Sequence, residues 1–149
     1  MKGLVLSLGA VAAALSLTFG LSVASASSSS ATKVGSANST LGRILVDSHG
    51  RTLYLFAKDK KGKSACSGAC AAYWPPLLAS GKPHAVNGAK ASLLGTSRRA
   101  DGRLQVTYRH HPLYKYAGDA GRGQTNGQGL DDFGGKWWVL SPAGNKITS

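Results

Sequence analysis

The sequence predicts a mainly β fold: two tandem, pseudo-symmetric, hairpin-based repeats in one small domain, with one short helix. The first supporting observation is composition, because the 149 residues include 20 glycines and all six acidic residues are aspartates. A chain without glutamate is an unusual helix bundle, whereas glycine suits short strands joined by turns. The second is a series of short β-branched and aromatic runs between turn residues. The third is an internal repeat.

The first segment has the features of a signal peptide, which we expect to span residues 1–26. Lys2 supplies a positive charge, and residues 3–21 form an apolar stretch. Ala24-Ser25-Ala26 is the small-x-small pattern of a signal peptidase site. No cysteine stands at this site, so N-terminal lipidation is not expected. The mature chain is predicted to be secreted, either extracellular or associated with the cell envelope, with no transmembrane span after cleavage.

The rest of the chain divides by composition. Residues 27–40 are small and polar, which predicts a flexible tether. A two-repeat β-rich domain is expected over residues 41–149. Within it, the first repeat covers about 41–81, a linker covers 82–100, and the second repeat covers about 101–144.

Self-similarity defines the two repeats. Residues 53–59 align with residues 113–119 at an offset of 60, and Trp74 aligns with Trp137 at an offset of 63. Both matches occur in the same order along the chain, which indicates two copies of one supersecondary unit.

Each repeat is expected to open with a hairpin. The strands and turns are, in order, 43–46, the turn Asp47–Gly50 and 51–56, then 103–108, the turn Arg109–Pro112 and 113–116. Alternation within the returning strands gives an aliphatic and an aromatic face, and the aromatic face is expected in the core or a groove. A helix is expected over residues 64–73, ended by Pro75-Pro76. A glycine-rich loop over 121–129 precedes a final strand at 137–140.

Eight residues occupy equivalent positions in the two copies, and we expect them to be structural: Tyr54, Phe56, Asp59, Trp74, Tyr114, Tyr116, Asp119 and Trp137. A short carboxylate after a strand can accept hydrogen bonds from amides of the following turn, which is the role expected for Asp59 and Asp119. The alternative is that these carboxylates bind a metal or another ligand.

These motifs resemble those of the bacterial secreted-repeat lipoproteins, a family named for its Tyr-x-aromatic-x-x-Asp motif. The resemblance covers about residues 41–144 and rests on Tyr54-x-Phe56-x-x-Asp59, Cys66-x-Gly68-x-Cys70-Ala71, Trp74-Pro75-Pro76, Gln105-Val106-Thr107-Tyr108 and Pro112-Leu113-Tyr114. It implies an extracytoplasmic location and a tandem repeat, with no established activity. Many members of the family are lipid-anchored through an N-terminal cysteine, which this chain lacks.

Cys66 and Cys70 are the only cysteines. In an oxidising compartment they are expected to form a local disulfide, and no cofactor is then expected. The alternative is an extracytoplasmic copper-binding or redox carrier, in which two thiolates on one helical face hold Cu(I). His110 or His111 is the possible further ligand, although both histidines also fit a solvated turn.

The charge gives the clearest indication of function. The formal net charge is +12, and the anion-binding candidates are Lys58, Lys60, Lys61, Lys63, Arg98, Arg99 and Arg103. Outside the cell, such a surface attracts wall phosphate polymers, acidic lipid headgroups or extracellular DNA without sequence specificity. The alternative is a surface that only aids solubility. Hydrolase motifs are absent and no catalytic residue is assigned. The sequence therefore predicts a non-enzymatic repeat protein that associates with the cell envelope or an anionic extracellular partner.

Overall fold

The computed structural model describes residues 30–149 and, before them, residues 3, 9–10, 12–14, 16 and 20–25. Half of the predicted signal peptide, residues 1–26, and residues 27–29 of the predicted tether therefore lie outside the described residues. Among these residues, regular secondary structure begins at Lys33. None of the helices in the described part of the chain has the length and apolar character needed to cross a membrane.

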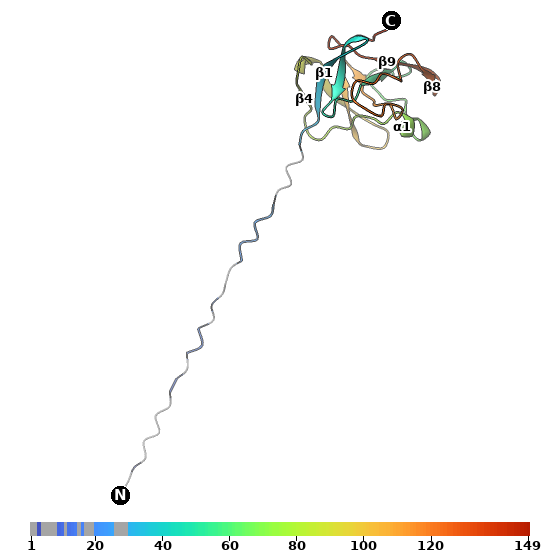
Figure 1. Cartoon of the computed structure of the whole chain (residues 1–149). Helices are drawn as coiled ribbons and strands as arrows, with labels where there is room; N and C mark the ends of the chain where they lie inside the picture. Colours follow the sequence, from blue (N-terminus) through green and yellow to red (C-terminus); the bar gives the residue numbers. More distant parts are fainter. Residues whose placement is uncertain (1–2, 4–8, 11, 15, 17–19, 26–29) are drawn as a thin grey trace.

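The fold is mainly β, as predicted, and it contains three small sheets (Figure 1). Their strand orders are β2-β1-β4, β3-β9-β8 and β5-β6-β7. The elements are β1 (Lys33–Ser39), β2 (Gly42–Asp47), β3 (Tyr54–Phe56), α1 (Ala69–Tyr73), β4 (His84–Ala85), a 3-10 helix (Ala91–Leu93), β5 (Leu94–Arg98), β6 (Leu104–Tyr108), β7 (His111–Pro112), β8 (Asp131–Asp132) and β9 (Gly135–Val139).

The first strand lies in the segment predicted as a tether, so the prediction for residues 27–40 is wrong from Lys33 onward. β1 pairs antiparallel with β2 along most of its length, and its first residues pair in parallel with β4. Small residues are needed there, because a Cβ atom on Gly35 would lie 3.1 Å from the side chain of Val86. The small residues of β1, which led to the prediction of a tether, instead allow neighbouring segments to pack closely against this strand.

Each repeat begins with a strand that the sequence analysis missed. β5 pairs with β6 as β1 pairs with β2, so part of the predicted linker, residues 82–100, belongs to the second repeat. In the first repeat the predicted turn Asp47–Gly50 is formed, and Val46 pairs with Thr52 beyond it. Each unit is therefore a three-stranded meander, and the predicted hairpin is its second half.

The second hairpin turns more tightly than predicted. Its turn consists of Arg109 and His110 alone, with φ angles of 46° and 66°. His111 and Pro112, which were predicted in the turn, instead form β7 against the end of β6. Proline is accepted there because β7 is an edge strand of its sheet.

The helix is shorter than the predicted range 64–73. It begins at Ala69, directly after Gly68, whose φ of 57° is not helical. Ser64, at the predicted start, instead contributes its side chain to hydrogen bonds with Tyr114 and Arg99. The residues before α1 therefore form an irregular loop that packs on the second repeat.

The two repeats meet about a pseudo-twofold axis between Tyr54 and Tyr114. Each donates its backbone N–H to the carbonyl oxygen of the other, at N···O distances of 2.8 and 3.0 Å. β3 is buried on both faces, because Tyr54 and Phe56 belong to one core cluster while Leu55 belongs to the other. The aromatic face therefore lies in the core, and so does the aliphatic face.

Candidate functional site

Four motif rings form one continuous stack through the core. Trp137 stacks on Phe56 and on Trp74, with ring centroids 4.0 and 3.9 Å apart, and Trp74 stacks on Tyr116 at 4.4 Å. The rings come alternately from the first and the second repeat. The pseudo-twofold axis exchanges Phe56 with Tyr116 and Trp74 with Trp137, so the stack has the same order of equivalent residues when followed from either end. The stack therefore joins the two repeats.

The motif tyrosines bind the motif aspartates of the opposite repeat. Tyr54 Oη donates to Asp119 Oδ2 at 2.6 Å, and Tyr114 Oη donates to Asp59 Oδ2 at 2.8 Å. The other carboxylate oxygen of each aspartate accepts a backbone N–H from its own following loop, six or seven residues later. Each aspartate thus connects its own loop to the other repeat.

Burial shifts the protonation of these groups. It raises the pKa of Asp59 to about 6 and also raises the pKa of Asp119. The same cause raises the pKa of the Tyr54 and Tyr114 hydroxyls well above the ordinary value for tyrosine. The tyrosines therefore stay neutral hydrogen-bond donors, and Asp59 titrates closest to neutral pH among the groups with a resolved value.

We expect the wild-type protein to gain stability relative to Asp59→Asn as pH falls from 7 to 5. The folded-state pKa of about 6 lies above the ordinary 3.8, so the folded state binds this proton more tightly and the free energy of unfolding rises as pH falls through 6. The expected gain is about 1 kcal/mol. Urea unfolding of both proteins at pH 7, 6 and 5 measures it, and a pH-independent difference contradicts the assignment.

The predicted disulfide is formed, and a buried arginine holds the loop around it. Cys66 and Cys70 are bonded to each other and buried. Arg99 is only 7% exposed, and its guanidinium donates to Cys66 O at 2.7 Å and Gln105 Oε1 at 2.8 Å. The prediction that Arg99 binds external anions is therefore wrong, because the residue is buried and its two Nη atoms donate to acceptors that folding removes from water.

The other two arginines of the predicted second cluster are exposed, but they also have partners within the chain. Arg103 contacts Asp101 Oδ2 through two nitrogen atoms at 2.8 and 3.0 Å. Arg98 donates to the carbonyl oxygen of Gly102 at 2.7 Å. The three arginines therefore do not form one free cationic cluster.

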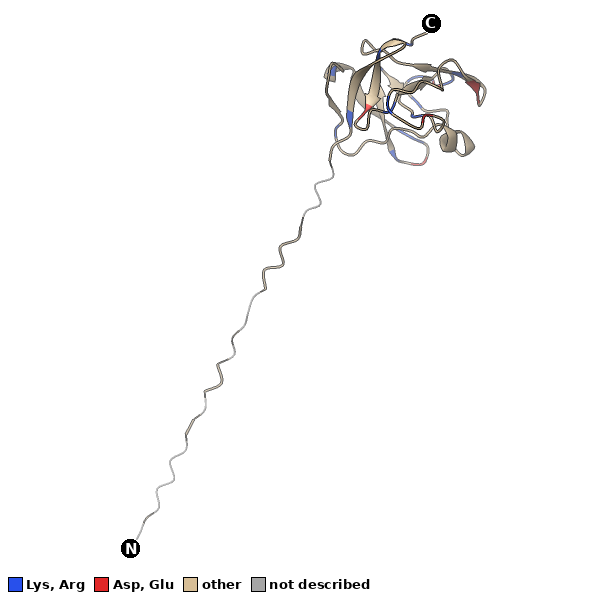
Figure 2. Cartoon of the chain, in the orientation of Figure 1, with Lys and Arg blue, Asp and Glu red and all other residues tan. Residues whose placement is uncertain are grey.

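The lysines of the first predicted cluster remain free. We call Lys58, Lys60, Lys61 and Lys63 the basic tip. All four are exposed, and none takes part in the ion pairs found among the described residues. Figure 2 shows blue positions on several sides of the domain and few red ones, of which the clearest marks β8. The basic tip is thus part of a predominantly positive surface.

Two cavities that share His111 lie beside the turn of the second hairpin, the smaller one between this turn and Lys61 of the basic tip, and we call them together the basic groove. The first has a volume of about 520 Å³ and is lined by Leu55, Ala57, Arg109, His111 and Lys146, among others. The second, of about 440 Å³, is lined by Asp59, Lys61, His110 and His111, among others. His111 lines both cavities.

The structure places the two predicted histidines differently. His110 is exposed at the turn, whereas His111 is half-buried in the groove. Burial lowers the pKa of His111, and the nearby Arg109 and His110 lower it further. Sequence reasoning missed Arg109 and Lys146, because only the fold brings these two separate segments to one cavity.

The sulfur atoms of the two cysteines are bonded to each other, so in this form they offer no thiolate to copper. Among the residues that the structure describes, no three histidine, cysteine or acidic side chains gather as a metal site. The neighbouring carboxylates Asp131 and Asp132 also have partners within the protein: Asp132 accepts a hydrogen bond from Trp74 Nε1, and Asp131 pairs with Lys136. The copper alternative therefore requires that the disulfide first be reduced.

One protein family matches the chain twice. It is described as a secreted repeat of unknown function, and its matches cover residues 35–78 and 95–141. Each match starts within the first strand of a three-stranded unit, β1 or β5, so the family repeat includes the strand that the sequence analysis missed. No curated protein and no solved structure matches the chain.

Proposed function

Because this chain belongs to the family of secreted repeats of unknown function, we propose that it is a non-enzymatic domain that associates with an anionic component of the cell envelope. The observation that supports this proposal is the different environment of acidic and basic side chains. Most aspartates are engaged inside the protein, whereas many lysines and arginines face solvent.

The aspartates add little free negative charge to the surface. Two are buried, two are half-buried and accept hydrogen bonds from core side chains, and two are exposed but paired with a basic side chain. These are, in the same order, Asp47 and Asp119, Asp59 and Asp132, and Asp101 and Asp131. A chain of net charge +12 with its acids so engaged attracts polyanions over a broad surface.

The same contacts support a binding role over a catalytic one. Asp59 and Asp119 stand at equivalent positions, and each is bonded to a tyrosine and a backbone amide. Paired acid–base catalysis needs two carboxyl groups with different environments that face a substrate. Here the duplicated carboxylates serve the same structural contacts in both repeats.

The basic tip gives the first test. We expect Lys60→Gln/Lys61→Asn/Lys63→Gln to bind isolated cell-envelope material more weakly than the wild type in 50 mM salt. Asparagine is chosen for Lys61 because its φ is 52°. If all three lysines contact the polymer, the dependence of log affinity on log salt concentration falls by about two to three units. Co-sedimentation between 50 and 300 mM NaCl measures both quantities.

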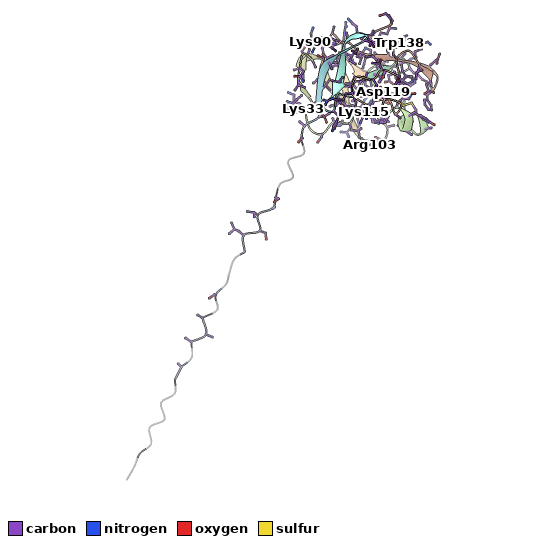
Figure 3. All side chains as sticks on the ribbon, viewed as in Figure 1. Lys33, Lys90, Arg103, Lys115, Asp119 and Trp138 are labelled. Carbon is purple, nitrogen blue, oxygen red and sulfur yellow. A yellow bond between two sulfur atoms is a disulfide. The ribbon has the colours of Figure 1, made fainter. Side chains whose placement is uncertain are left out.

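A matched control removes the same charge elsewhere. Lys33→Gln/Lys82→Gln/Lys90→Gln removes three exposed lysines, two of which lie along one edge of the domain (Figure 3). Salt-insensitive binding of the wild type, or none at all, would contradict the proposed function. Equal weakening of both triple variants would mean that the overall charge binds the envelope and the tip has no special part.

A further inference from the structure

We infer that the basic groove is a site for consecutive phosphate groups of a linear phosphodiester polymer whose repeating units are aliphatic. This inference rests on the proposed function, since it names the site and the ligand class for that association. It is carried by the convergence of basic side chains on the groove and by the conformation of the turn that provides Arg109 and His110.

The groove collects basic side chains from three separate segments. Arg109 and Lys146 line the larger cavity, and Lys61 and His110 line the smaller one. His111 lines both cavities, so a linear ligand that occupies the two cavities passes along this side chain. The acidic residue there, Asp59, already accepts hydrogen bonds on both carboxylate oxygens. The groove thus offers two adjoining positions for negatively charged groups.

The turn that supplies Arg109 and His110 has an unfavourable backbone for these residues. Three other non-glycine residues with positive φ, Lys61, Asn87 and Phe133, are each followed by a glycine that also has positive φ. Among the described residues, Arg109–His110 is the one such pair without a glycine. Two-residue turns of this kind strongly favour Asn-Gly, which would build the same hairpin with less strain. Arg109 adds a guanidinium at the larger cavity, where one of its nitrogen atoms donates to Asn145 Oδ1, and His110 adds an imidazole at the smaller one. Strain of this kind persists at functional positions.

The corresponding turn of the first repeat is built differently, although its cavity is also lined by basic side chains, Lys33 and Lys115, together with Asp47 and His49. Asp47 caps the turn there, since its carboxylate accepts the backbone N–H groups of His49 and Arg51. One copy therefore keeps an acid-capped turn, and only the other has the strained basic turn.

The lining of the groove favours phosphates joined by aliphatic units. An arginine guanidinium binds a phosphate through two parallel hydrogen bonds, and a lysine adds a point charge. Leu55 and Ala57 give the larger cavity an aliphatic lining. Trp138, which is opposite Leu55 on β9, has Lys146 Nζ 5.6 Å from its ring centroid. That lysine covers one face of the ring, and in the described part of the chain no Phe, Tyr or Trp lines either cavity to stack a nucleic-acid base.

The test uses a synthetic glycerol phosphate oligomer and the variant Arg109→Asn/His110→Gly. We expect roughly tenfold weaker binding at low salt, because a bidentate phosphate contact is lost. We also expect a melting temperature no lower than that of the wild type, because relief of the turn by Asn-Gly offsets the lost hydrogen bond between Arg109 and Asn145. Lys146→Gln leaves the turn intact and is expected to weaken binding as well. Arg98→Asn removes one exposed cation outside the groove and is the matched control, with at most a twofold effect expected.

The outcomes separate the two proposals. If the wild type binds neither this oligomer nor any other polyanion, both the proposed function and the proposed phosphate site are wrong. If the wild type binds but the groove variants weaken it no more than Arg98→Asn, the groove is overturned while the proposed function stands. An oligothymidylate or poly-L-glutamate of equal charge that binds as tightly as the glycerol phosphate oligomer overturns the ligand class. Weaker binding of both supports it.

Discussion

Replacing Trp137 with alanine is expected to lower the free energy of unfolding by about 3–5 kcal/mol, a large part of the stability of a small domain. The indole is fully buried and stacks between Phe56 and Trp74. The ring edge of Tyr114 also packs against it, at a centroid distance of 5.1 Å. Alanine removes all three contacts and leaves a cavity within the ring stack.

The adjacent tryptophan provides the control. Trp138 is half-buried and lies outside the ring stack, so Trp138→Ala is expected to cost less than half as much. Urea unfolding of the two variants, followed by far-ultraviolet circular dichroism, measures both free energies. Equal losses would show that the stack contributes no more than burial of any large side chain.

The second large effect is expected at Arg99. Arg99→Met keeps much of the side-chain volume but leaves Gln105 Oε1 without the arginine donor and Cys66 O with only the Ser64 hydroxyl, at 3.3 Å, in a buried site. Breaking such a contact set destabilises a protein by about 3 kcal/mol or more. The loop that carries the disulfide should then open more often. We therefore also expect dithiothreitol to reduce the Cys66–Cys70 bond faster, as measured by trapping of free thiols.

Arg103→Met is the matched comparison. It removes an exposed arginine whose partner, Asp101, is also exposed, and such pairs contribute at most about 1 kcal/mol. If Arg99→Met is no more destabilising than Arg103→Met, the buried network has no special role in stability. An unchanged rate of disulfide reduction would separately contradict the link between Arg99 and the loop.

The repeat and its motif could be predicted because they depend on local sequence. The alternation around Tyr54 and Phe56 indicates a strand, and the same spacing around Tyr114 and Tyr116 indicates a second copy. β1 could not be recognised in this way. Its small residues carry no apolar periodicity, and the close approach of Val86 that requires Gly35 exists only after folding.

The candidate site was harder to predict, because proximity in sequence is a poor guide to exposure. Arg98, Arg99 and Arg103 are the same residue type and lie close together in the sequence. Even so, the side chain of Arg99 is buried, while those of the other two are at the surface. Conversely, Arg109 and Lys146 carry no shared motif and meet only through the fold. The hydrogen bond from Tyr54 of the first repeat to Asp119 of the second also depends on how the two repeats pack against each other.

The alternating ring stack and the crossed tyrosine–aspartate bonds make this fold, in effect, a homodimer closed within one chain. A single repeat has only every second ring of the stack, a tyrosine hydroxyl without its carboxylate, and a carboxylate without its tyrosine. It can complete these contacts only with another copy of itself. Folding of the halves is therefore interdependent, and the shared interior constrains both copies equally. Their outer turns carry no such constraint, which is where the acid-capped turn at Asp47 and the basic turn at Arg109 differ.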